Sequence, residues 1–152
     1  MSFADEEKGG TDLATSRGRD WPSVRQFNVF LENRIGGLMN VVRRFENADV
    51  RIVSLMVIDS VDVAIIRMVF DDPERAVEIL ELGKLPYTES DLLVVKMPES
   101  AHPLLEITKT LLQSEINIHY VYPMLIQFGP EHCSALALHV EDLEAASATL
   151  QG

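Results

Sequence analysis

Cysteine and basic residues are scarce in this 152-residue sequence. The single cysteine, Cys133, cannot form a disulfide within the chain, and it gives no cluster of thiolate ligands for a metal. Lys and Arg number 13 against 24 Asp and Glu, so the formal net charge is −11. A field of this sign repels nucleic acids and anionic membranes, and neither is an expected partner.

Long apolar segments are also missing. No apolar run approaches the ~18 residues that a membrane span requires. The first ten residues, MSFADEEKGG, are acidic and lack the apolar core of a secretory signal. The expected location is therefore the cytoplasm.

Catalytic patterns are absent as well. The sequence contains no nucleophile elbow, no paired carboxylates, no phosphate-binding loop and no His–Cys pattern. The acids spread over helix faces, as at Glu74, Glu78 and Glu81, where a solvated surface is predicted. The histidines, at 102, 119, 132 and 139, lack the spacing of metal ligands. We predict a protein that is not an enzyme and that has neither a metal nor a cofactor.

The most informative segment runs from Gln26 to Ile52. Alternating apolar residues from Phe27 to Leu31 predict a strand. Helical spacing then predicts one buried stripe, formed by Leu38, Val41, Val42 and Phe45. Between the two lies Asn33-Arg34-Ile35-Gly36-Gly37, whose glycines favour a sharp turn and let a ligand approach main-chain N–H groups. Because the helix begins here, its unpaired N–H groups and dipole suit a carboxylate or a phosphate.

The rest of the first half completes a βαββαβ order, which is the ferredoxin-like fold. Strands are predicted at 50–58, 63–70 and 85–89, with a polar turn at 59–62. Asp72 and Pro73 predict the start of a second helix, and Gly83 predicts its end. The buried side of this helix is expected at Ala76, Ile79 and Leu80.

The same pattern then repeats. A strand is predicted at 92–97, and the next helical stripe copies the first one 66 residues later, at Leu104, Ile107, Thr108 and Leu111. We therefore predict an α+β protein of two tandem ferredoxin-like repeats, with antiparallel sheets and with helices on one face. The predicted parts are a disordered tail at 1–24, one domain at 25–91 and another at 92–152.

The second repeat is predicted to lack its last strand, because the sequence ends after that repeat's second helix. A missing strand leaves a sheet edge open, and open edges favour pairing. A homodimer or a higher homo-oligomer is expected.

The loop and the repeat together resemble the ACT domain, a small ligand-binding regulatory module with this βαββαβ fold. The first loop of that family reads Asp/Asn-x-Pro-Gly-x-Leu, and here it reads Asn33-Arg34-Ile35-Gly36-Gly37-Leu38, with Ile35 in place of proline. The family's Asn-Ile pair at the start of the second strand is present as Asn117-Ile118, whereas the first repeat has Arg51-Ile52. The resemblance covers about 25–152 and implies a tandem regulatory protein with no attached enzyme.

The resemblance also implies a ligand site, in which an amino acid lies at an interface between domains. His102 stands where Gly36 would be in the second repeat, and the first repeat lacks the second-strand asparagine. We therefore predict one composite site, with the loop facing Asn117; its residues are Asn33, Arg34, Ile35, Gly36, Gly37, Leu38 and Asn117. Helix amides would hold the ligand carboxylate, and the carboxamides would bind its amino and carboxyl groups.

Simpler interpretations of the same residues stay open. The glycines could serve only a tight turn, and Asn117 could be a turn residue. Asn33 could cap the following helix.

The predicted function is a non-catalytic regulator that binds a small amino acid at an ACT interface and transmits binding to a partner protein by a population shift. The partner could be an enzyme or another regulator. One alternative is the regulatory subunit of an amino-acid biosynthetic enzyme such as acetolactate synthase. A third and less favoured reading is an acylphosphatase-like hydrolase, in which Arg34 and the loop amides would hold a phosphoryl group.

Overall fold

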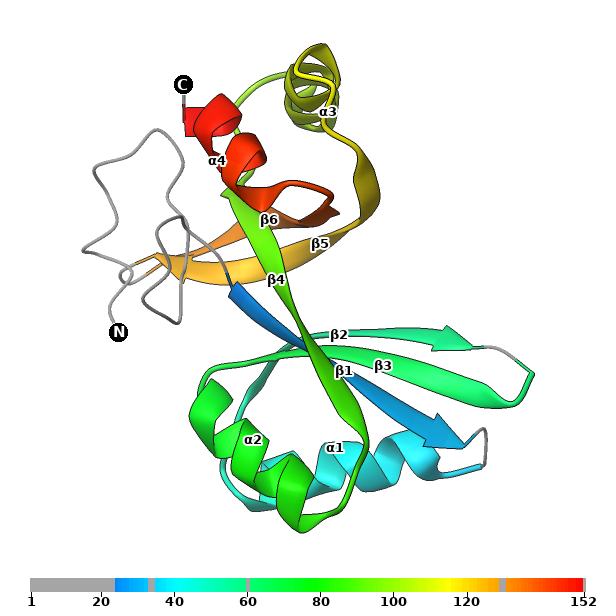
Figure 1. Cartoon of the computed structure of the whole chain (residues 1–152). Coiled ribbons are helices and arrows are strands. Elements are labelled where there is room, and N and C mark those ends of the chain that lie inside the picture. Colours follow the sequence, from blue (N-terminus) through cyan, green and yellow to red (C-terminus); the bar gives the residue numbers. More distant parts are fainter. Residues whose placement is uncertain (1–23, 33–34, 60, 129–130, 152) are drawn as a thin grey trace. The chain divides into compact units, whose positions relative to one another are not determined.

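A computed structural model describes residues 24–32, 35–59, 61–128 and 131–151. Within these residues no helix has the length and apolar character that crossing a membrane requires. The elements, drawn in Figure 1, are β1 (Val24–Glu32), α1 (Gly37–Asn47), β2 (Ile52–Asp59), β3 (Val63–Phe70), α2 (Pro73–Leu82), β4 (Tyr87–Lys96), α3 (Pro103–Gln113), β5 (Ile118–Phe128), β6 (Glu131–Val140) and α4 (Leu143–Gln151).

The chain divides into two compact units. The N-terminal unit is Arg25–Ser90, and the C-terminal unit begins at Asp91 and also includes Val24. The strand order is β2-β3-β1-β4 in the N-terminal unit and β4-β6-β5 in the C-terminal unit. β1 and β2 pair antiparallel with β3, and β4 and β5 pair antiparallel with β6. The predicted fold class is confirmed: two tandem ferredoxin-like repeats, with no strand after α4 among the described residues.

The core of the N-terminal unit forms where α1 and α2 cover one face of the sheet (Figure 1). Phe27 of β1 lies opposite Met68 of β3, and neither side chain is exposed to solvent. Phe45 of α1 packs against Phe70 with 4.3 Å between the ring centroids. Each fully buried side chain of this size contributes about 1.5–3 kcal/mol relative to an exposed one, so this layer holds the helices in place.

The helical stripes predicted for α1 and α3 are buried only in part, and their members Val42 and Thr108 are half-buried. Val41 and Phe45 of α1 are buried, and so are Ile107 and Leu111 of α3. The first members of both stripes, at 38 and 104, are instead exposed. The stripe predicted for α2 is confirmed in full, because Ala76, Ile79 and Leu80 are all buried.

The start of α2 is as predicted. Pro73 is its first residue, and the Asp72 carboxylate caps it by accepting a hydrogen bond from the Arg75 N–H at 3.1 Å. The end differs in detail. Gly83 is the capping residue but has an ordinary φ of −78°, and Lys84 takes the left-handed conformation with φ 53°.

The break predicted between strands at 85–89 and 92–97 is wrong, because β4 is one strand from Tyr87 to Lys96. The polar residues at the expected break are satisfied inside the sheet: Nδ2 of Asn28 donates to the hydroxyls of Thr88 and Ser90 at 3.2 and 2.9 Å. Neither glycine nor proline interrupts this segment, so the strand continues from one unit into the other. The second strand also begins later than predicted, at Ile52 rather than at 50.

Candidate functional site

The turn before α1 depends on a left-handed glycine. Gly36 has φ 85° and ψ −5° and is the N-cap of α1. Its carbonyl accepts a hydrogen bond from the Asn40 N–H at 3.0 Å, which closes the first helical turn. A Cβ built on Gly36 would meet no atom of the described residues within 4 Å, its two chain neighbours aside, so the space in front of this residue is open in the described part of the chain. Glycine is required here by the backbone angle and not by crowding.

Gly37 has a different role from its neighbour. It is the first residue of α1, and a Cβ there would lie 3.7 Å from Cδ1 of Leu31 and 3.8 Å from the Glu32 carbonyl oxygen. These are ordinary van der Waals distances. The end of β1 therefore packs against the first turn of α1 and fixes the direction of that helix.

The first turn of α1 is exposed and contains no acidic residue. Ile35 is fully exposed, and Leu38 and Met39 of the first turn are 40% and 57% exposed. Gly36 has no side chain that could cap the helix, and the first turn of α1 contains no acidic residue. The unpaired N–H groups and the positive end of the helix dipole thus face solvent, an arrangement that favours an anion.

The other three described helices begin differently. The first turns of α2, α3 and α4 contain Glu74, Glu106 and Glu144, respectively. Proline occupies the first position of α2 and of α3, which removes one N–H donor from each. His102, which stands where Gly36 stands in the first repeat, has φ −136° and so does not form the left-handed turn. Among these four helices, α1 is therefore the one whose N-terminus best suits a carboxylate.

Asn117 directly precedes β5 and is exposed. Its carbonyl accepts a hydrogen bond from the Glu141 N–H at 3.0 Å. It lines two open depressions on the C-terminal unit. One is bounded by the residues before β5 and the start of α4, and the other lies between α3 and β5. The backbone of Asn117 is thus tied to the β6–α4 connection.

The two halves of the predicted composite site belong to different units, the loop to the N-terminal unit and Asn117 to the C-terminal unit. Their pairing stays a prediction. Asn33 and Arg34 lie outside the described residues. Gly36 occupies the N-cap position of α1, and the interpretation of Asn33 as a cap stays a prediction.

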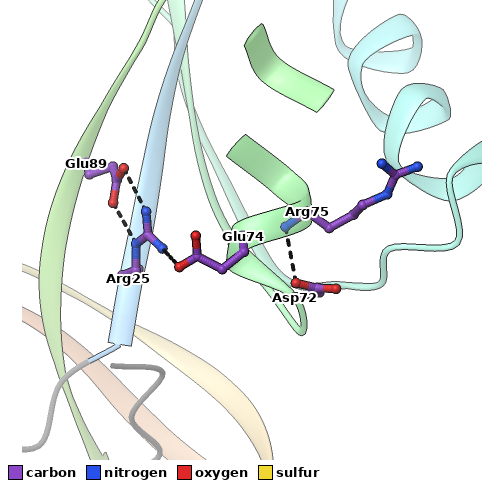
Figure 2. A network of polar contacts seen from close by, with 5 residues as sticks. All are labelled: Arg25, Asp72, Glu74, Arg75 and Glu89. Carbon is purple, nitrogen blue, oxygen red and sulfur yellow. Dashed lines mark hydrogen bonds and ion pairs between the residues drawn. The ribbon is translucent and has the colours of Figure 1, made fainter. Parts of the chain in front are cut away.

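Sequence reasoning missed a charged network in the N-terminal unit (Figure 2). Arg25 of β1 donates from Nε and Nη2 to the two carboxylate oxygens of Glu89 at 2.6 and 2.9 Å. Its Nη1 donates to Glu74 at 2.9 Å. The hydrogen bonds to Glu89 raise the pKa of Arg25 above its usual value, against the opposite effect of burial. No periodic signal links residues 64 and 49 positions apart.

The helix-face acids that the sequence assigns to a solvated surface are indeed exposed, but each has a partner. Glu74 pairs with Arg25, and Glu78 pairs with Arg75 at 2.8 Å. Glu81 accepts a hydrogen bond from the Tyr87 hydroxyl at 3.2 Å. Over the described part of the chain, no three His, Cys, Asp or Glu side chains gather as metal ligands would.

Comparison with known proteins gives a family match. The model of a family described as an ACT domain pair matches residues 22–132, which is more than half of the chain. None of the curated proteins matches the chain by sequence.

Solved structures share the fold over most of their length. A protein from Bacteroides thetaiotaomicron superposes with a TM-score of 0.74 at 20% identity, covering 84% of this chain and 86% of that one. The regulatory subunit of aspartate kinase from Thermus thermophilus gives 0.55 at 11% identity, covering 84% and 89%. The corresponding subunit from Thermus flavus gives 0.52 at 12% identity, covering 86% and 92%. At these identities the likeness shows the fold.

Proposed function

Because the chain belongs to the ACT domain family, as an ACT domain pair, we propose that it is a non-catalytic regulatory protein that binds a small amino acid and transmits binding to a partner protein. The observation that carries this proposal is the N-terminus of α1. It combines a left-handed glycine, an open space in front of that glycine and a first turn without acids.

The ligand chemistry follows from these groups. A free amino acid carries a carboxylate, which the N–H groups of the first turn of α1 would bind. Its ammonium group needs acceptors, and the carboxamide oxygens of Asn33 and Asn117 would supply them. Ile35 and Leu38 would contact an apolar part of the ligand. The site is thus proposed to take a small zwitterion, held by neutral groups and a helix dipole.

The binding mechanism would be a shift between assembly geometries. A ligand that touches a loop of one repeat and Asn117 of another favours the arrangement in which both contacts form. A coupling of ~1–3 kcal/mol is the usual size for such effects. The favoured arrangement would then present a surface to the partner protein, in a homodimer or a larger homo-oligomer.

A thermal-shift screen of the free amino acids tests the proposal. A ligand at 100 times its dissociation constant should add about 2.7 kcal/mol of stability, and calorimetry should then give its affinity. Gly36→Val should abolish binding, and Gly36→Asn should weaken it while keeping the fold, because asparagine tolerates the left-handed region. Gly37→Ala is the matched control, since its Cβ faces Leu31 and not the open space. Unchanged affinity in a folded Gly36→Val variant would refute the site.

The asymmetry of the two repeats predicts the stoichiometry. The start of α3 has Pro103 and Glu106 where α1 has neither a proline nor an acid, so it should not bind a second carboxylate. Calorimetry should give one ligand per chain. Two equivalent ligands per chain would contradict the assignment of the site to the first loop.

The identity of the partner separates the two regulatory readings. If the chain is a regulatory subunit of an amino-acid biosynthetic enzyme, it should copurify with a large catalytic protein and change that protein's inhibition by its end product. If it acts on another kind of regulator, no catalytic subunit should copurify.

A further inference from the structure

The edge strand of the N-terminal unit, β2, lacks the features that usually protect an exposed edge. Among the described strands, β2 ends the strand order in the N-terminal unit and β5 ends it in the C-terminal unit. β5 contains Pro123, which has no N–H and so interrupts the row of donors on its free edge. From Ile52 to Ile58, β2 contains neither a proline nor a charged residue. Its outer row of N–H and C=O groups is therefore suited to pairing with another strand.

Apolar side chains on both faces of β2 are exposed. Leu55 and Val57 point to the face that the helices cover, because they lie opposite the core residues Met68 and Ile66 of β3. They are nevertheless 39% and 41% exposed, and Ile58 on the other face is 37% exposed. A nearly continuous apolar run is typical of a strand that is covered on both faces. β2 thus has the sequence of a central strand at the position of an edge strand.

The charges on and beside β2 fit a second copy of the same strand. From Ile52 to Ile58 the strand is neutral, so two chains that each have a net charge of −11 can meet here without opposing charged side chains along it. Residues of opposite sign flank this run. Arg51 precedes it, Asp59 follows it, and both are exposed. Antiparallel pairing brings the basic end of each copy to the acidic end of the other, whereas parallel pairing would bring like charges together.

We propose that this edge is the contact of a homodimer, in which β2 of one chain pairs antiparallel with β2 of another about a two-fold axis. The register follows from the regular part of the strand. The β2–β3 ladder shifts between Ile52 and Ser54 and is regular from Ser54 to Asp59. An axis at Met56 therefore uses the regular part of both copies.

This register covers exposed apolar side chains with their own counterparts. Leu55 of each copy lies beside Val57 of the other on the face of the helices, and Met56 lies beside its symmetry mate on the other face. The dimer contact is thereby assigned to the first repeat, whereas the sequence suggested an open edge in the second. The contact requires no ligand, so the proposal can fail while the amino-acid proposal stands.

Sedimentation equilibrium of the full chain, from micromolar to submillimolar concentrations, tests the contact. The unmodified protein should be a dimer. Val57→Lys should raise the dissociation constant of the dimer at least about tenfold, because it places a charge on both paired edges. Its circular dichroism spectrum should not change, since Val57 is 41% exposed. Val121→Lys is the matched control, because Val121 is a 38% exposed valine on the other edge strand, β5, and this variant should remain a dimer.

Cross-linking checks the register and keeps the test decisive if Val57→Lys does not fold. In a Cys133→Ser background, Met56→Cys should form a disulfide-linked dimer on mild oxidation. Opposed residues of an antiparallel pair have Cα atoms about 4.5–5.5 Å apart, which a disulfide can span. Val121→Cys in the same background should form none.

Four results would overturn the proposal. The unmodified protein could be a monomer throughout the concentration range, or Val57→Lys could dimerise as tightly as the unmodified protein. Val121→Lys could weaken the dimer as strongly as Val57→Lys, which would place the contact elsewhere. Met56→Cys could give no more cross-linked dimer than Val121→Cys.

Discussion

Replacing Gly36 by alanine isolates the cost of a left-handed residue. Its chain neighbours aside, no atom of the residues that the structure describes lies within 4 Å of the new Cβ, so alanine creates no clash with them. The remaining cost is that of a non-glycine residue at φ 85°, about 1–2 kcal/mol. Part of it is offset because alanine lowers the entropy of the unfolded chain, worth about 0.4–1 kcal/mol. Gly36→Ala should therefore lower the free energy of unfolding by about 1 kcal/mol.

The neighbouring glycine should respond with the opposite sign. Gly37 is helical, and its new Cβ would make van der Waals contacts at 3.7 and 3.8 Å with the end of β1. Alanine is preferred over glycine in a helix and restricts the unfolded chain. Gly37→Ala should raise the free energy of unfolding by about 0.5 kcal/mol, less than the full helix preference because the position is the first of the helix.

Urea unfolding followed by circular dichroism measures both changes. For both variants, the slope of the unfolding free energy against urea concentration should match that of the unmodified protein. The shift of each urea midpoint then reports a change in stability alone. Gly36→Asn should fall between the unmodified protein and Gly36→Ala, because asparagine tolerates the left-handed region. If Gly36→Ala proves as stable as Gly37→Ala, the left-handed turn is not required, and the argument for an open helix N-terminus loses its basis.

Three further outcomes are expected. Lys84→Gly should raise the urea midpoint, since glycine relieves a left-handed φ of 53° at a gain of about 0.5–1 kcal/mol, and a lower midpoint would contradict the backbone assignment. Asp72→Ala should lower the thermal midpoint through the loss of the cap on Arg75, worth ~1 kcal/mol, whereas Asp72→Asn should retain most of it. Burial, followed by the hydrogen bond to Glu81, raises the pKa of Tyr87 above 10.0. In an alkaline spectrophotometric titration, Tyr87→Phe should therefore remove a tyrosine step whose midpoint lies above that of free tyrosine; the stabilisation from this group is present below about pH 10 and is lost as the pH rises through the higher pKa of the folded state. Loss of a step at the pKa of free tyrosine or below it would argue against that environment.

Local signals in the sequence predicted local structure well. Asp72-Pro73 predicted a capped helix start, and both the cap and the proline are where the pattern placed them. The duplication is visible in the backbone itself: Asp49 and Glu115, at matching positions after α1 and α3, both take left-handed angles, with φ 62° and 57°. Patterns of this kind are predictable because neighbouring residues in the sequence determine them.

Features that depend on residues far apart in the chain escaped prediction. Separate strands were predicted at 85–89 and 92–97, yet Asn28 of another strand donates a hydrogen bond to Ser90 and β4 continues through this segment. Glu74 was assigned to a solvated face, because no sequence pattern indicates that Arg25 reaches it. The candidate site is divided in the same way. The left-handed turn at Gly36 follows from the two glycines, whereas the pairing of that turn with Asn117 depends on an assembly that no local pattern specifies.

The differences between the two repeats are more informative about function than their similarities. Duplication supplies two equivalent helix starts, and neither has a side-chain hydrogen bond that caps it. In this chain α3 has a proline and an acid in its first turn, whereas α1 retains glycine, no acid and an open approach. An uncapped helix start is a cost to stability, because its N–H groups are left to water and an acid there would be favourable. A ligand carboxylate is the group that would offset this cost. For that reason the first repeat is proposed as the binding half, and the second repeat, in which Asn117 is exposed at the start of β5, as the half that completes the site.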